Sequence, residues 1–110
     1  MLTDHPLRGF IFENWVITEK AKSYYNQGID PPFYFWRDVK GHEVDLLEDR
    51  GTLLYPTEIK ASSTFHSDFV KGLIYVNSLQ KSRPTSGACI YTGKESFTFK
   101  GFQITQWADI

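Results

Sequence analysis

The pattern of apolar positions at the start of the chain predicts a long helix. Across residues 8–27, apolar and aromatic side chains recur every three or four residues, along two neighbouring stripes. Phe12 and Val16 belong to one stripe, and Phe10 and Ile17 belong to the other. Because the first two turns are apolar nearly all round, we expect this helix to be packed on two sides.

Short apolar runs then predict three strands, at residues 33–38, 42–47 and 52–61. The connections between them, residues 39–41 and 48–51, are short and each contains glycine, which is typical of hairpins. The three runs therefore predict an antiparallel meander. Aromatic side chains dominate the first run, which favours a buried strand, with base stacking as the alternative.

The second half of the chain alternates between helical and extended patterns. An amphipathic stripe predicts a helix at residues 67–80, and a short apolar run predicts a strand at residues 88–92. A strand reached through a helix can lie parallel to the strand before that helix. Residues 96–99 and 102–107 complete the pattern with a closing hairpin. The order α-β-β-β-α-β plus a tail hairpin indicates an α/β fold, with helices flanking a mixed sheet.

Composition narrows the class of protein. The 110 residues suffice for one domain, and 41% apolar with 16% aromatic content argues against disorder. The formal net charge of −1 implies no strongly basic face. No apolar run approaches the roughly 20 residues that cross a bilayer, so we expect no membrane association. Cys89 is the only cysteine, which predicts a buried small side chain and a reducing, cytoplasmic location.

Candidate chemistry lies on the second and third predicted strands. Alternation along each strand places Asp45 on the same face as Leu47 and opposite Val44, and it places Glu58 on the same face as Lys60. If the two strands form a hairpin, the carboxylates of Asp45 and Glu58 lie close together. Two neighbouring carboxylates repel each other and lose hydration, and a hard divalent cation such as Mg²⁺ relieves both costs.

This arrangement suits phosphodiester hydrolysis with Mg²⁺ or Mn²⁺ as cofactor. Lys60 would orient the attacking water or stabilise negative charge that develops on a phosphate. The alternative is a solvated strand face on which Asp45 and Lys60 form a structural ion pair.

Four segments together resemble one known family, with the densest matches over residues 7–64. The segments are Gly9 to Val16, Tyr34 to Arg37, His42 to Leu47, and Thr57 to Ser62. They resemble the restriction-endonuclease-like domain of the PD-(D/E)xK superfamily that is found C-terminal to many prokaryotic AAA-type ATPases.

The resemblance implies a restriction-endonuclease-like core and assigns roles to the candidate residues. Asp45 matches the motif aspartate, Glu58 and Lys60 match the E-x-K pair, and Glu13 matches a helix glutamate that can complete the metal site. Asp45, Glu58 and the Ile59 carbonyl would then hold the metal. For Glu13, a surface glutamate at a helix edge is the alternative.

The resemblance is incomplete in two respects. Val44 stands where the superfamily motif has proline, and no G-x-x-x-x-G-K-[ST] sequence occurs in the 110 residues. We therefore expect residues 1–110 to be a single nuclease-like domain from the C-terminal end of a longer ATPase protein. The expected function is a metal-dependent nuclease-like domain acting on DNA, and the alternative is a non-catalytic accessory domain of such an ATPase.

Overall fold

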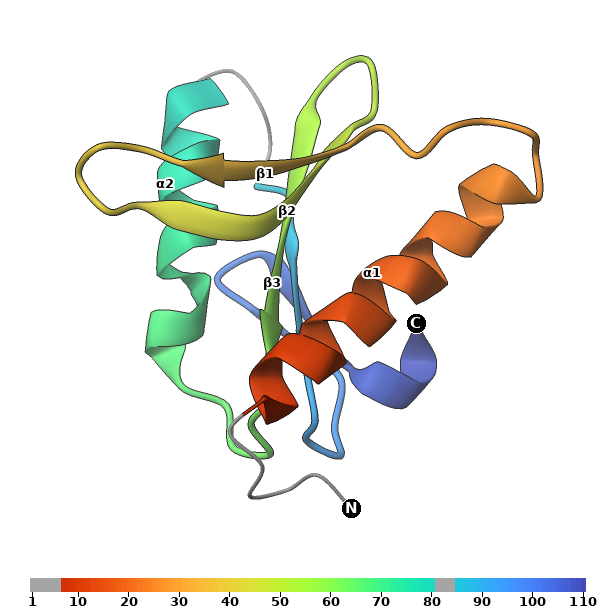
Figure 1. The fold of residues 1–110 in the computed structure, drawn as a ribbon. Coiled ribbons are helices and arrows are strands. Elements are labelled where there is room, and N and C mark those ends of the chain that lie inside the picture. Colours follow the sequence, from red (N-terminus) through yellow and green to blue (C-terminus); the bar gives the residue numbers. More distant parts are fainter. Residues whose placement is uncertain (1–6, 81–84) are drawn as a thin grey trace.

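A single mixed sheet organises the chain (Figure 1). The computed structural model describes residues 7–80 and 85–110. The strands are β1 (Phe33–Arg37), β2 (Glu43–Asp49), β3 (Leu54–Lys60), β4 (Ala88–Tyr91), β5 (Phe97–Phe99) and β6 (Phe102–Gln106). They form a six-stranded sheet in the order β1-β2-β3-β4-β6-β5. The predicted meander, the strand parallel to β3 and the closing hairpin are all confirmed, and β6 also runs parallel to β4.

Two α-helices cover opposite faces of this sheet (Figure 1). Helix α1 spans Arg8–Tyr25, and helix α2 spans Lys71–Gln80 after a 3₁₀ turn, η1, at Ser67–Val70. The predicted helix at residues 67–80 is therefore helical throughout, but its first turn is 3₁₀. A second 3₁₀ turn, η2, follows β6 at Trp107–Asp109. None of the helices in the described ranges has the length and apolar character needed to span a membrane.

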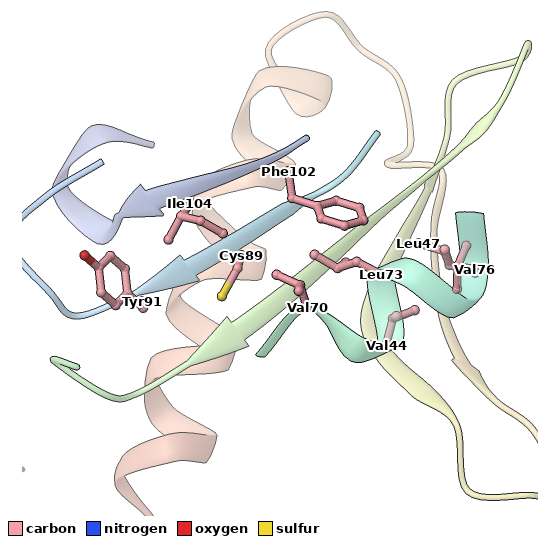
Figure 2. Packing of buried hydrophobic residues seen from close by; sticks show 9 residues of the cluster. All are labelled: Val44, Leu47, Val70, Leu73, Val76, Cys89, Tyr91, Phe102 and Ile104. Carbon is pink, nitrogen blue, oxygen red and sulfur yellow. The ribbon is translucent and has the colours of Figure 1, made fainter. Parts of the chain in front are cut away.

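The main core lies between the sheet and α2 (Figure 2). Its buried members come from η1, α2 and the three strands β2, β4 and β6, namely Val44, Leu47, Val70, Leu73, Val76, Cys89, Tyr91, Phe102 and Ile104. A smaller cluster joins Val16 of α1 to Ile59 and Ile90 on the other face. Neighbouring residues of β4 thus serve different clusters, because successive side chains of a strand point to opposite faces.

The sequence predicts that helix α1 is packed on two sides, and in the described part of the chain the helix is only partly covered. Val16 and Ala21 are its buried residues, whereas Phe10, Ile11 and Trp15 are exposed. Ile17 of the neighbouring stripe also packs against the cluster at Val16, so both stripes reach the sheet, while Phe10 in the first turn stays exposed.

The edge strand β1 also differs from the prediction of a buried aromatic strand. Phe33 and Trp36 are partly buried, but Tyr34 and Phe35 are exposed. β1 is an edge strand of the sheet (Figure 1), and α1 reaches it through the contact of Tyr24 with Phe33, which leaves Tyr34 and Phe35 exposed.

A β-bulge interrupts the pairing of β1 with β2. The β2 partners of Tyr34 and Trp36 are three residues apart, so that Asp45 and Leu46 together lie opposite Phe35. Two residues facing one is the pattern of a bulge, which bends the strand and redirects its side chains.

The bulge breaks the side-chain alternation that the sequence predicts for β2. Val44 and Leu47 both join the core cluster against α2, although strict alternation places them on opposite faces. The extra residue at Asp45–Leu46 shifts the alternation by one position, so that both side chains point to the face that packs against α2. The prediction that Val44 and Leu47 point to different faces of the sheet is therefore wrong.

Candidate functional site

Asp45 occupies the point where β2 and β3 separate. The two strands pair from Asp49 opposite Leu54 to Leu46 opposite Thr57, and the recorded pairing ends there. Beyond that point β2 turns away from β3 (Figure 1). One carboxylate oxygen of Asp45, Oδ2, accepts a hydrogen bond from the backbone N–H of Ile59 at 2.8 Å. The side chain of Asp45 thus takes the place of the backbone acceptor that β2 no longer offers to Ile59 of β3.

Glu58 lies beside Asp45 in the buried part of the fork. It is 5% exposed, and its carboxyl group interacts with that of Asp45. Its Oε2 lies 3.2 Å from Nζ of Lys60, whose side chain is 38% exposed. Its Oε1 is buried and has no hydrogen-bond partner among the described residues. The structure therefore brings together Asp45, Glu58 and Lys60, as the sequence predicts.

Burial is the largest single influence on the pKa values of Asp45, Glu58 and Lys60. It raises the pKa of Glu58 to about 8, and the charge of Asp45 adds to this effect, while Lys60 opposes it. Burial also raises the pKa of Asp45, against the hydrogen bond from Ile59 and the charge of Lys60. For Lys60, burial lowers the pKa, but the charges of Glu58 and Asp45 outweigh it and raise the pKa overall. Near neutral pH the pair therefore holds a proton, and Lys60 stays charged.

Glu13 approaches this site from α1. Burial raises its pKa first, followed by the charge of Asp45, with Lys60 acting in the opposite direction. Glu13 and Asp45 both line an open depression of about 440 Å³, together with Phe35, Trp36 and Arg37 of β1 and Glu43 and Val44 of β2. Glu13 therefore borders the same depression as Asp45.

The donor set fits a hard divalent cation in chemistry but is only partly assembled. Asp45 and Glu58 supply carboxylate oxygens, and the unpaired Oε1 of Glu58 has lost its hydration without gaining a partner. Within residues 7–80 and 85–110, no group of three or more potential metal-ligating side chains is drawn together. Asp45 and Glu58 are thus the two candidate ligands that lie side by side, and Glu13 would have to move closer to become a third. A metal role for Ile59 stays a prediction.

A comparison with protein families identifies the family to which the chain belongs. Residues 8–110 match a family model described as a domain of unknown function (DUF4143). The chain belongs to the DUF4143 family. Neither a curated protein nor a solved structure matches it. The match covers both α-helices and every strand, so the DUF4143 domain contains Glu13, Asp45, Glu58 and Lys60.

Cys89 of the DUF4143 domain lies next to Glu58 in the sheet, and its thiol is unreactive. It pairs with Glu58 across β3 and β4 and is fully buried. Burial raises the pKa of its thiol to about 12, and the charge of Glu58 adds to the shift. The thiolate nucleophile is therefore suppressed, and the prediction of a buried small side chain is confirmed.

Gly72 is a positioning residue that the sequence analysis did not single out. A Cβ at this position of α2 would lie 2.5 Å from the carbonyl oxygen of Glu43 and 3.2 Å from Oε1 of Glu58. Only glycine lets α2 approach the fork this closely. A glycine inside an amphipathic helix is the sequence signal that could have identified it.

A second polar cluster in the DUF4143 domain was also missed. Glu48 is buried, accepts a hydrogen bond from Nη2 of Arg50 at 3.0 Å, and accepts another from the hydroxyl of Tyr24. Burial lowers the pKa of the nearby Lys20. Sequence reasoning placed Glu48 in a turn, but β2 continues to Asp49, which carries Glu48 into the sheet. This cluster lines a separate cavity of about 460 Å³ between α1 and the sheet.

Proposed function

We propose that this DUF4143 domain is a metal-dependent nuclease-like domain with a restriction-endonuclease-like core. It binds or hydrolyses DNA phosphodiesters. The observation that carries the proposal is the position of the buried carboxyl group of Glu58 beside the half-buried carboxyl group of Asp45, with Nζ of Lys60 3.2 Å from Oε2 of Glu58. Placing one buried and one half-buried acid side by side is costly for stability, because both carboxyl groups lose hydration. Such a cost is expected where a function requires the charges.

Each residue has a defined role in this proposal. Asp45, Glu58 and the carbonyl of Ile59 would hold Mg²⁺ or Mn²⁺, and Glu13 would complete the site from α1. The cation, when bound, neutralises the carboxylates and lowers the pKa of a coordinated water. Lys60 is partly exposed beside Glu58, so its ammonium can donate to the attacking water or to a phosphate oxygen.

Lys60 has geometry suited to this role. Its Nζ is held 3.2 Å from Oε2 of Glu58 and lies 5.8 Å from the centre of the Phe69 ring. These contacts limit the positions the ammonium can take and keep it near the carboxylates. A positioned charge stabilises a transition state more than a mobile one does, because it needs little reorganisation during the reaction.

The direct test is a cleavage assay with linear, nicked and branched DNA in Mg²⁺ or Mn²⁺. We expect metal-dependent cleavage that falls by about 100-fold or more in Asp45→Asn and in Lys60→Ala. Asp49→Asn is the matched control, since it removes a carboxylate from the same strand outside the site and keeps an acceptor for the turn hydrogen bond to Gly51. Cleavage that needs no metal, or that is unchanged in Asp45→Asn, would refute the catalytic proposal.

A second candidate is a non-catalytic accessory domain that serves an AAA-type ATPase, either in the same longer chain or as a separate partner. The net charge of −1 favours it, because a nuclease acting alone gains affinity from basic contacts to phosphates. Calorimetric titration with Mg²⁺ separates the two candidates. Binding that disappears in Asp45→Asn supports the nuclease-like site, whereas no binding to the unmodified domain supports the accessory role.

A further inference from the structure

Phe35 presents an aromatic ring to solvent at an unusual place. Its side chain is 74% exposed, more than any other aromatic residue in the described ranges. It lies on β1, at the edge of the sheet. Because most of the ring lies outside the core, its surface is accessible to a partner outside the chain.

The fold places this ring next to the candidate site. Phe35 is the single β1 residue opposite the bulge at Asp45 and Leu46, and neighbouring strands lie only about 5 Å apart. Phe35 and Asp45 also line the same depression, which Glu13 reaches from α1. The aromatic surface and the carboxylates therefore border one continuous space.

Two contacts made by the residues that follow Phe35 hold strand β1 in position. The ring of Trp36 packs against that of Tyr75 on α2, with ring centres 5.7 Å apart. Nη2 of Arg37 lies 3.1 Å from Oε2 of Glu43 across the hairpin. A ring on an anchored strand loses little conformational freedom when a ligand stacks on it.

The chemistry of the depression selects the ligand. One wall is an aromatic ring, and the floor contains carboxylates that attract a cation and, through it, a phosphate. A nucleotide combines a flat base, which can stack on the ring, with a phosphate, which can bind a cation held by the carboxylates. An apolar protein side chain would stack on the ring but would bring neither a cation nor a phosphate to the carboxylates of Glu13 and Asp45.

We infer that Phe35 stacks on an unpaired nucleobase next to the phosphodiester bound at Asp45, which makes single-stranded DNA or an unpaired DNA end the substrate class. This inference rests on the proposed function. A base inside a duplex is covered on both faces and cannot offer one to Phe35. Stacking also supplies affinity that a domain of net charge −1 does not obtain from phosphate contacts alone.

The test is fluorescence anisotropy with a labelled oligothymidine strand and with a duplex of the same length. Ca²⁺ replaces Mg²⁺ so that binding is measured without cleavage. We expect the single strand to bind more tightly, Phe35→Ala to weaken it about tenfold, and Phe35→Trp to retain it. Tyr34→Ala is the matched control, because Tyr34 is an exposed aromatic residue on the same strand that does not line the depression.

Equal affinity for strand and duplex, no binding of either, or unchanged binding in Phe35→Ala would each overturn the inference. Its failure is distinguishable from failure of the proposed function. Duplex cleavage that needs Asp45 and ignores Phe35 would retain the function and reject the stacking. Strand binding that needs Phe35, without cleavage by any variant, would retain the stacking and reject catalysis.

Discussion

Among the candidate residues, Glu58 has the environment that most disfavours a charged side chain. It lies in the interior of the sheet, its Oε1 has no hydrogen-bond partner among the described residues, and Lys60 compensates only its Oε2. The folded chain therefore prefers the protonated, neutral form of this carboxyl group. In an unfolded chain the same carboxyl group would titrate near its ordinary pKa of 4.5. The difference links proton binding to folding.

The first prediction concerns the pH dependence of stability. Below about pH 4.5 both states hold the proton, so Glu58 carries no penalty. As the pH rises towards about 8, the unfolded chain releases the proton while the folded chain retains it, and the free energy of unfolding falls. Above that pH the penalty is complete. Urea unfolding between pH 5 and pH 9 measures this fall.

The variant Glu58→Gln isolates the contribution of this group. We expect its free energy of unfolding to decline less steeply with pH and to exceed that of the unmodified protein by about 1–3 kcal/mol near pH 9. Raised pKa values of Asp45 and Glu13 act in the same direction, so the comparison between variants, not the absolute slope, is decisive. Parallel pH profiles for the two proteins would contradict the buried-acid assignment.

At the scale of elements, the site depends on how closely α2 approaches the fork between β2 and β3. The helix comes within contact distance of the Glu43 carbonyl at Gly72, and the bulge in β2 turns Val44 towards the same helix. The helix and the bulge together form the wall against which Glu58 is buried.

The second prediction is that Gly72→Ala destabilises the domain. The added methyl group would meet backbone at 2.5 Å, so α2 or β2 must shift. We expect a loss of about 1–3 kcal/mol in the free energy of unfolding, typical of overpacking, despite the higher helix propensity of alanine. Chemical denaturation measures it.

Gly9→Ala in α1 is the matched control for that experiment. A methyl group at Gly9 meets nothing within 4 Å, so we expect no loss and a gain of up to about 1 kcal/mol from helix propensity. If both substitutions had the same effect, close approach at Gly72 would not be the cause.

At the scale of the whole molecule, the two faces of the sheet are covered unequally. Helix α2 closes the main core, whereas α1 contacts the other face mainly through Val16. Glu13 lies on this less tightly packed helix, so its distance from Asp45 can change without disrupting the main core. A ligand that draws Glu13 to the site would tie α1 more firmly to the sheet.

The third prediction is therefore that Mg²⁺ stabilises the whole domain. A ligand that binds only the folded state at ten times its Kd adds about 1.4 kcal/mol, which corresponds to roughly 5 °C in Tm for a domain of this size. Thermal unfolding with MgCl₂, against NaCl at equal ionic strength, measures the shift. We expect Asp45→Asn to abolish it and Glu13→Gln to reduce it. An equal shift in all three proteins would indicate general salt effects.

Much of the fold could be predicted because the signals are local. Side-chain period distinguishes the helix at residues 8–27 from the strands that follow, and glycine-containing turns mark the hairpins. The type of residue also indicated Asp45, Glu58 and Lys60 as a group. These features depend on neighbours in the chain, so the sequence contains them directly.

The exposure of Phe35, the bulge at Asp45 and the close approach at Gly72 were decided only by the tertiary structure. Each depends on how distant segments are arranged around that position. At Phe35 the ring is left exposed on an edge strand, at Asp45 two β2 residues lie opposite one, and at Gly72 a helix lies against a backbone carbonyl. Residue types alone determined that two acids and a lysine were available. The burial that raises the pKa of Glu58 and the fork that presents Asp45 arise from packing between distant segments, and packing has no local signature in the sequence.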